Sequence, residues 1–117
     1  MKTDNVILTK SKAFALRVIK LYKYLCGKRM EFVMSKQIMR SGTSIGANVR
    51  EATRAQSTPD FISKMNIALK EAEETCYWLK LLHESEYLDE RVFNSLYNDS
   101  MELLKILASI VKTSRAA

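Results

Sequence analysis

Residues that interrupt regular secondary structure are scarce in this chain. Its 117 residues include three glycines and one proline, well below the average use of about 7% glycine and about 5% proline. An all-β sandwich or barrel needs a turn roughly every 8–12 residues, and most turns depend on such residues. The chain is therefore expected to form a few long helices within a single domain over residues 1–117.

Apolar residues recur at spacings of three and four along four segments, which is typical of amphipathic helices. The helices are expected over residues 5–26, 31–56, 59–83 and 89–113. Gly27 is expected to stop the first helix in the left-handed conformation. Thr58 and Pro59 fit the start of the third helix, and Asp89 fits the cap of the fourth. Because short connections make neighbouring helices antiparallel, the predicted fold is an all-α, antiparallel up-down four-helix bundle.

Side chains suited to catalysis or metal binding are few. The two cysteines, Cys26 and Cys76, fall on apolar helix faces, and His83 is the one histidine. A structural zinc site needs about four ligands, and bundle metal sites combine inward glutamates with Glu-x-x-His pairs. Neither pattern occurs, nor does a glycine-rich phosphate loop. We expect no metal, no cofactor and no enzymatic activity.

The apolar runs of the chain are short. None approaches the roughly 20 residues that cross a bilayer. The N-terminal segment lacks the apolar core and cleavage site of a signal peptide. We expect no membrane partner and a cytoplasmic location.

The two halves of the chain differ in charge. Residues 1–58 contain 12 basic and three acidic residues, a net charge of +9, whereas residues 59–117 have a net charge of −3. A one-sided basic field favours a polyanion or a complementary copy of the same protein.

A basic stripe follows the second predicted helix. On a helical wheel its cations fall within roughly 80° of arc, and cations of the first helix extend the surface. The predicted phosphate contacts are Lys36, Arg40, Arg50, Arg54, Arg17 and Lys20. The alternative interpretation is an ordinary solvated face. No aromatic platform is evident beside the stripe, so the sequence does not favour stacking of single-stranded bases.

A polar cluster borders the apolar face of the second helix. Its members there are Ser44, Asn48 and Glu51, and their expected partners on the third helix are Glu74 and Thr75. Buried polar groups must be hydrogen-bonded. The cluster is either a lock that fixes the register of two helices or a ligand site, and we favour the lock.

Several apolar residues fall outside the expected core. They are Ile67, Trp78 and Leu81 on the third helix and Leu16 and Tyr24 on the first. Tryptophan is enriched at interface hot spots. These residues are either additional core, solvated positions or the interface of an oligomer, and we assign them to the interface.

The segment from Ser41 to Ala52, SGTSIGANVREA, resembles the S-I-x-A-N-I-x-E-G signature of the 23S rRNA intervening-sequence proteins, also called four helix bundle proteins. The segment from Phe61 to Leu79 is similar to the third helix of that family, and Lys12-Ala-Phe14 to its start. The resemblance spans about residues 5–113. Ala52 departs from it, because the family commonly has glycine there.

This resemblance implies an antiparallel four-helix bundle that assembles as a ring-like homopentamer. Genes of the family were recognised inside insertions in large-subunit rRNA genes. A related protein, the accessory variability protein of diversity-generating retroelements, is a basic pentamer that works with a reverse transcriptase and nucleic acid. The family provides no catalytic residues to carry over.

Composition and resemblance together predict a non-catalytic, oligomeric nucleic-acid-binding protein, whose partner is structured RNA or an RNA–DNA hybrid. The alternative is a homo-oligomeric scaffold or accessory subunit whose basic face docks an acidic protein partner.

Overall fold

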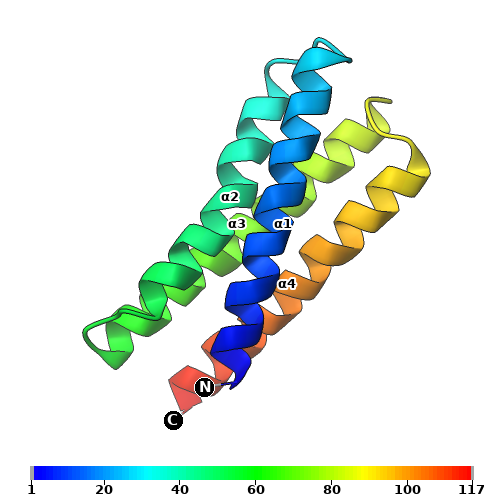
Figure 1. Ribbon diagram of the computed structural model, residues 1–117. Coiled ribbons are helices and arrows are strands. Elements are labelled where there is room, and N and C mark those ends of the chain that lie inside the picture. Colours follow the sequence, from blue (N-terminus) through cyan, green and yellow to red (C-terminus); the bar gives the residue numbers. More distant parts are fainter. Residues whose placement is uncertain (1, 117) are drawn as a thin grey trace.

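The computed structural model describes residues 2–116, and the side chains of residues 6–116. Every element in this range is an α-helix: α1 (Lys2–Gly27), α2 (Met34–Ala52), α3 (Thr58–Glu84) and α4 (Glu90–Ala116). Consecutive helices run antiparallel in an elongated bundle of 46 × 21 × 19 Å (Figure 1). The all-α four-helix bundle predicted from the sequence is confirmed.

The connection between α1 and α2 differs from the sequence expectation. Gly27 stays helical and has no positive φ; the left-handed residue is Met30, with a φ of 53°. Helix α2 begins at Met34 instead of residue 31 because the buried Glu31 acts as its cap. The Glu31 carboxylate accepts hydrogen bonds from the backbone N–H groups of Val33, Met34 and Ser35 at 3.0, 2.9 and 2.7 Å. These are donors that the first turn of a helix otherwise leaves unpaired.

The other helix boundaries follow local capping chemistry. Helix α2 ends at Ala52, earlier than the expected residue 56, in a turn that leads directly to the cap of α3. That cap is Ser57, one residue before the expected Thr58; its Oγ accepts the backbone N–H of Asp60 at 3.2 Å. Asp89 caps α4 as the sequence predicts, and its Oδ1 accepts the N–H of Val92 at 2.8 Å.

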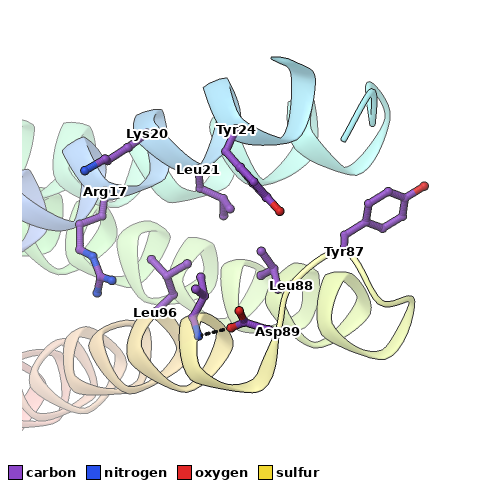
Figure 2. Close-up of a pocket in the computed structure, with 9 residues that line it drawn as sticks. Arg17, Lys20, Leu21, Tyr24, Tyr87, Leu88, Asp89 and Leu96 are labelled. Atoms are coloured by element: carbon purple, nitrogen blue, oxygen red, sulfur yellow. Dashed lines mark hydrogen bonds between the residues drawn. The ribbon is translucent and has the colours of Figure 1, made fainter. Parts of the chain in front are cut away.

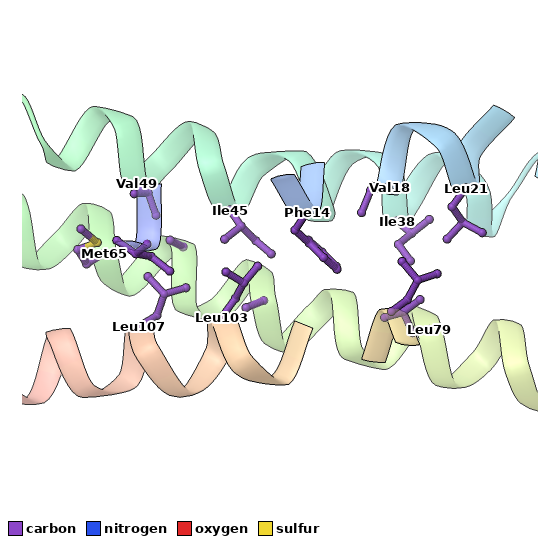
Figure 3. Packing of buried hydrophobic residues seen from close by; sticks show 14 of the residues in the cluster. Phe14, Val18, Leu21, Ile38, Ile45, Val49, Met65, Leu79, Leu103 and Leu107 are labelled. Carbon is purple, nitrogen blue, oxygen red and sulfur yellow. The ribbon is translucent and has the colours of Figure 1, made fainter. Parts of the chain in front are cut away.

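The core is a continuous column of apolar side chains from all four helices. Figure 3 shows part of it, including Phe14, Ile45, Met65 and Leu103, all of which are buried. Helix α2 packs closely against both α1 and α3. Burial of this column supplies the main driving force for folding.

Helices α1 and α4 are the least tightly packed neighbours in the bundle. They lie close where the two termini meet and diverge toward the opposite end of the bundle (Figure 1). Residues of α1, of α4 and of the connection before α4 line a groove on this side of the bundle. None of the helices in the described range is long and apolar enough to cross a membrane.

Candidate nucleic-acid interface

Arg40, in the middle of the predicted basic stripe, is paired within the chain. Its guanidinium donates to Glu71 Oε2 of α3 at 3.2 Å and contacts Glu74 Oε2. It also donates to Gln37 Oε1 at 3.4 Å. This ion pair cluster ties α2 to α3 and neutralises the charge that would attract a phosphate.

Arg17 is paired in the same way across the open side of the bundle. Its Nη1 donates to Asp99 Oδ2 of α4 at 2.6 Å, and its Nη2 donates to Ser95 Oγ at 2.9 Å. About two turns toward the N-terminus, Lys10 reaches Glu102 at 3.3 Å. These polar bridges connect α1 to α4, the least tightly packed pair of neighbouring helices.

The remaining cations of the predicted set are exposed. Within residues 6–116, no carboxylate lies within ion-pair distance of Lys20, Lys36, Arg50 or Arg54. Lys36 and Arg50 share one face of α2. Arg54 lies in the turn beyond the end of α2, close in sequence to Arg50 but off the helix.

A shallow groove of about 690 Å³ separates the outer faces of α1 and α2. Arg50 lines it from α2 and Lys12 lines it from α1, with Leu16, Gly46 and Ala47 between them. Lys12 is a basic residue of this surface that was missing from the predicted set. Its place on the charged side of the first helix is the signal that would have identified it.

The predicted polar cluster does not assemble as a unit. Thr75 does bond to α2, but its partner is Ser41: the two hydroxyl oxygens are hydrogen-bonded at 2.9 Å, and both residues are fully buried. Asn48 donates to the carbonyl of Ser44 one turn earlier, at 2.8 Å. Glu51 is exposed and lies 3.9 Å from Lys64. The contact that links α2 to α3 is therefore a pair of hydroxyl groups, Ser41 and Thr75. Ser41 was not predicted, because serine is common on any helix face.

Glu74, the remaining member of the cluster, joins two predicted sites. Besides Arg40, it accepts a hydrogen bond from Trp78 Nε1 at 2.9 Å. Trp78 is half-buried against the core, so its ring is partly committed to this chain.

The other residues assigned to an oligomer interface differ in exposure. Leu16 is 59% exposed in the α1–α2 groove and Ile67 is 41% exposed on α3, whereas Leu81 is half-buried. Tyr24 is exposed but lies at the α1–α4 groove, far around the bundle from Ile67. The structure thus distributes these residues over several faces and does not bring all five together.

The α1–α4 groove has a volume of about 530 Å³ (Figure 2). Its floor is made by buried leucines, and its rim carries charged and aromatic side chains. The lining residues are Arg17, Lys20, Leu21, Tyr24, Tyr87, Leu88, Asp89, Val92 and Leu96.

The residues considered for catalysis occupy structural positions. The ring of His83 stacks on Phe93 with centroids 4.3 Å apart. Burial raises the pKa of the Cys76 thiol, which contacts Ser100 Oγ at 3.1 Å. No group of three or more His, Cys, Asp or Glu side chains is placed to hold a metal ion in the described part of the chain.

Fold and surface together define an antiparallel four-helix bundle with an exposed basic face on α2 and the adjoining turn. Residues 3–109 match the family described as 23S rRNA-intervening sequence protein. The chain belongs to this family, which confirms the resemblance seen in the sequence.

A solved structure extends the comparison. The crystal structure of a protein of unknown function from the S23 ribosomal protein family of Bacteroides thetaiotaomicron VPI-5482 is 59% identical to this chain, with a TM-score of 0.93. The match covers 94% of this chain and 98% of that one. None of the curated proteins compared with the chain matches it.

Proposed function

We propose that this protein is a non-catalytic RNA-binding protein of the cytoplasm that works as a homo-oligomer. The proposed partner is structured RNA or an RNA–DNA hybrid. The observation that carries the proposal is the set of exposed cations Lys36, Arg50 and Arg54, which no carboxylate of residues 6–116 neutralises. The family name refers to an intervening sequence of 23S rRNA, and this supports RNA over other polyanions.

Lys12 extends this surface across the α1–α2 groove, whereas Arg40 and Arg17 contribute less. An arginine bound to two carboxylates, as Arg40 is, brings no net positive charge to a phosphate. Cations that contact phosphates release condensed counterions, so affinity should fall steeply with salt. The interface is therefore expected to read the phosphate backbone, which fixes position and not sequence.

The oligomer is proposed as a ring-like pentamer, as the family resemblance implies. Exposed apolar side chains such as Leu16 and Ile67 support a further interface. A ring would repeat the basic face of each copy and strengthen binding through multivalency.

The test is RNA binding by the triple variant Lys36→Ala/Arg50→Ala/Arg54→Ala, measured by fluorescence anisotropy between about 50 and 200 mM salt. The matched control is Arg91→Ala/Lys105→Ala/Lys112→Ala, which removes three exposed charges from α4. We expect the first variant to bind weakly and its salt slope to fall by about 0.7–0.9 for each lost phosphate contact. The control should bind like the unmodified protein.

Equal affinity of the two triple variants, or an affinity independent of salt, would refute the proposal. A partner that co-purifies and survives nuclease treatment would instead indicate an acidic protein on the same face.

A further inference from the structure

The α1–α4 groove combines features that a nucleobase requires. The floor of the groove consists of three leucines that are each at most 6% exposed: Leu21, Leu88 and Leu96. The ring of Tyr24 projects from α1 across this floor (Figure 2). The groove has a volume of about 530 Å³, which falls in the range of small-molecule sites, about 300–1,000 Å³.

Two rim residues are apolar and still accessible. Tyr24 is 42% exposed and Val92 on the opposite helix is 41% exposed. An aromatic ring left accessible beside an apolar floor is the usual platform on which an unstacked base is held. The ring of Tyr87 does not serve this purpose, because it points away from the groove in Figure 2 and lies under the Arg29 guanidinium at 4.9 Å.

Charge divides the groove into two ends. Lys20 lies at one end with Arg17; Asp99 neutralises Arg17, whereas no carboxylate of residues 6–116 pairs with Lys20. Asp89 lies at the other end, beside Leu88 and below Tyr24 (Figure 2). A phosphate is attracted to the cationic end and repelled from the acidic end, so a bound nucleotide would have one orientation.

The carboxylate of Asp89 can discriminate between nucleobases. Its Oδ1 caps α4 through Val92, and an ionised carboxylate has further acceptor sites. These sites suit the exocyclic amino group of adenine or cytosine, as carboxylates accept from such groups elsewhere. Uracil lacks an amino group, and its single N–H donor lies between two carbonyl oxygens that the carboxylate disfavours, so uracil should bind more weakly.

We propose that the α1–α4 groove binds an unpaired, amino-bearing base of an RNA strand, with Tyr24 stacking on the base and Lys20 contacting the adjoining phosphate. The inference rests on the proposed RNA-binding function and adds the feature of RNA that is recognised. Bases within a duplex are stacked and paired, so only a bulge, loop or single strand can supply one. This platform could not be predicted from sequence patterns, because Tyr24 and Asp89 are 65 positions apart in the chain.

The experiment compares two RNA hairpins that differ only in one bulged adenine. Unmodified protein is expected to bind the bulged hairpin about tenfold more tightly, the scale of one stacked base. Tyr24→Ala should lose this preference, whereas Tyr24→Phe should retain it. Tyr77→Ala is the matched control, because Tyr77 is an exposed tyrosine on α3 outside the groove.

Two further measurements sharpen the result. Val92→Glu places a negative charge in the groove without touching the buried floor, and it should abolish the preference as Tyr24→Ala does. A bulged uracil should bind more weakly than a bulged adenine, and Asp89→Asn should reduce that difference. Thermal unfolding of each variant verifies that it is folded before binding is scored.

The possible failures are distinguishable. If the unmodified protein binds both hairpins equally in a salt-dependent manner, the groove proposal is wrong and the RNA-binding proposal stands. A bulge preference that survives both Tyr24→Ala and Val92→Glu places the base elsewhere and also overturns the groove site. Absence of binding to any RNA overturns both proposals.

Discussion

Gly42 of α2 lies so close to Val18 of α1 that a β-carbon on Gly42 would be 2.7 Å from Val18 Cγ2 and 3.3 Å from its Cβ. Val18 is fully buried, and a β-branched side chain has few alternative rotamers. The glycine therefore sets how closely the first two helices approach, and it does so beside the serine that locks α2 to α3.

Gly42→Ala should lower the free energy of unfolding by about 1 kcal/mol. Overpacking typically costs about 1–3 kcal/mol, and the better helix propensity of alanine offsets up to about 1 kcal/mol. Gly46→Ala is the control, because its β-carbon would come no closer than 3.4 Å to Ser11 and it should be neutral or slightly stabilising. Urea unfolding measures both. A Gly42→Ala variant as stable as Gly46→Ala would contradict the close approach.

Glu31 should make part of the stability dependent on pH. Burial raises the pKa of its carboxyl, but the hydrogen bonds from Met34, Ser35 and Val33 outweigh burial and hold that pKa below its ordinary value of 4.5. A folded pKa below the unfolded one adds stability that is fully present above about pH 4.5 and is lost as the pH falls through the folded value.

Glu31→Gln should therefore lower the free energy of unfolding by about 1 kcal/mol or more at neutral pH. It should also flatten the loss of stability below about pH 4.5. The measurement is thermal unfolding across a pH series. The control is Glu73→Gln, because Glu73 is an exposed glutamate of α3. It should change neither the free energy of unfolding at neutral pH nor the loss of stability in acid. If the stability of Glu31→Gln and that of the unmodified protein fall in parallel as the pH is lowered, the Glu31 carboxylate does not stabilise the protein as a helix cap.

The buried Ser41–Thr75 hydroxyl pair should show strong coupling. Thr75→Val leaves the Ser41 hydroxyl without its α3 partner and should destabilise the protein by about 1–3 kcal/mol. Adding Ser41→Ala removes the unpaired group, so the double variant should be more stable than additivity predicts. A double-mutant cycle of unfolding free energies gives the coupling. Strict additivity of the two substitutions would mean that the pair contributes nothing.

The Arg17–Asp99 ion pair should matter more for RNA binding than for stability. Its side chains are 39% and 46% exposed, and ion pairs in such surroundings are worth about 0–1 kcal/mol. Asp99→Asn frees Arg17 for a phosphate and should raise both RNA affinity and the salt slope. Glu84→Gln removes an equal charge without releasing an arginine. If both variants gain affinity equally, net charge and not Arg17 is responsible.

The exposed apolar residues Leu16 and Ile67 should carry the proposed oligomer interface. Leu16→Glu and Ile67→Glu are better probes than a change at Trp78, whose half-buried ring also supports the core. Each substitution should yield smaller particles by light scattering. Ser109→Glu, an exposed change on α4, should keep the parent mass. Retention of the parent mass by both glutamate variants would place the interface on another surface.

Local patterns were sufficient for the helices because each helix is specified by its own residues. The spacing of Phe14, Ile45 and Leu103 identified core faces, and Asp89 identified a cap, from neighbours within a few positions. The α1–α2 connection was less predictable. Glu31 has good helix propensity, and only the folded turn shows that its carboxylate serves better as a cap than as the first helical residue.

Sequence by itself determined the four-helix architecture, the family and the excess of cations in the first two helices, since periodicity and composition are local properties. Tertiary structure decided which cations remain available, because Arg17 and Arg40 meet carboxylates on α4 and α3 that lie far away in the chain. It also decided that Tyr24 and Asp89 share one groove. Those encounters depend on how the helices are placed around the core, and charge patterns along a single helix hold no information about the helix that will face them.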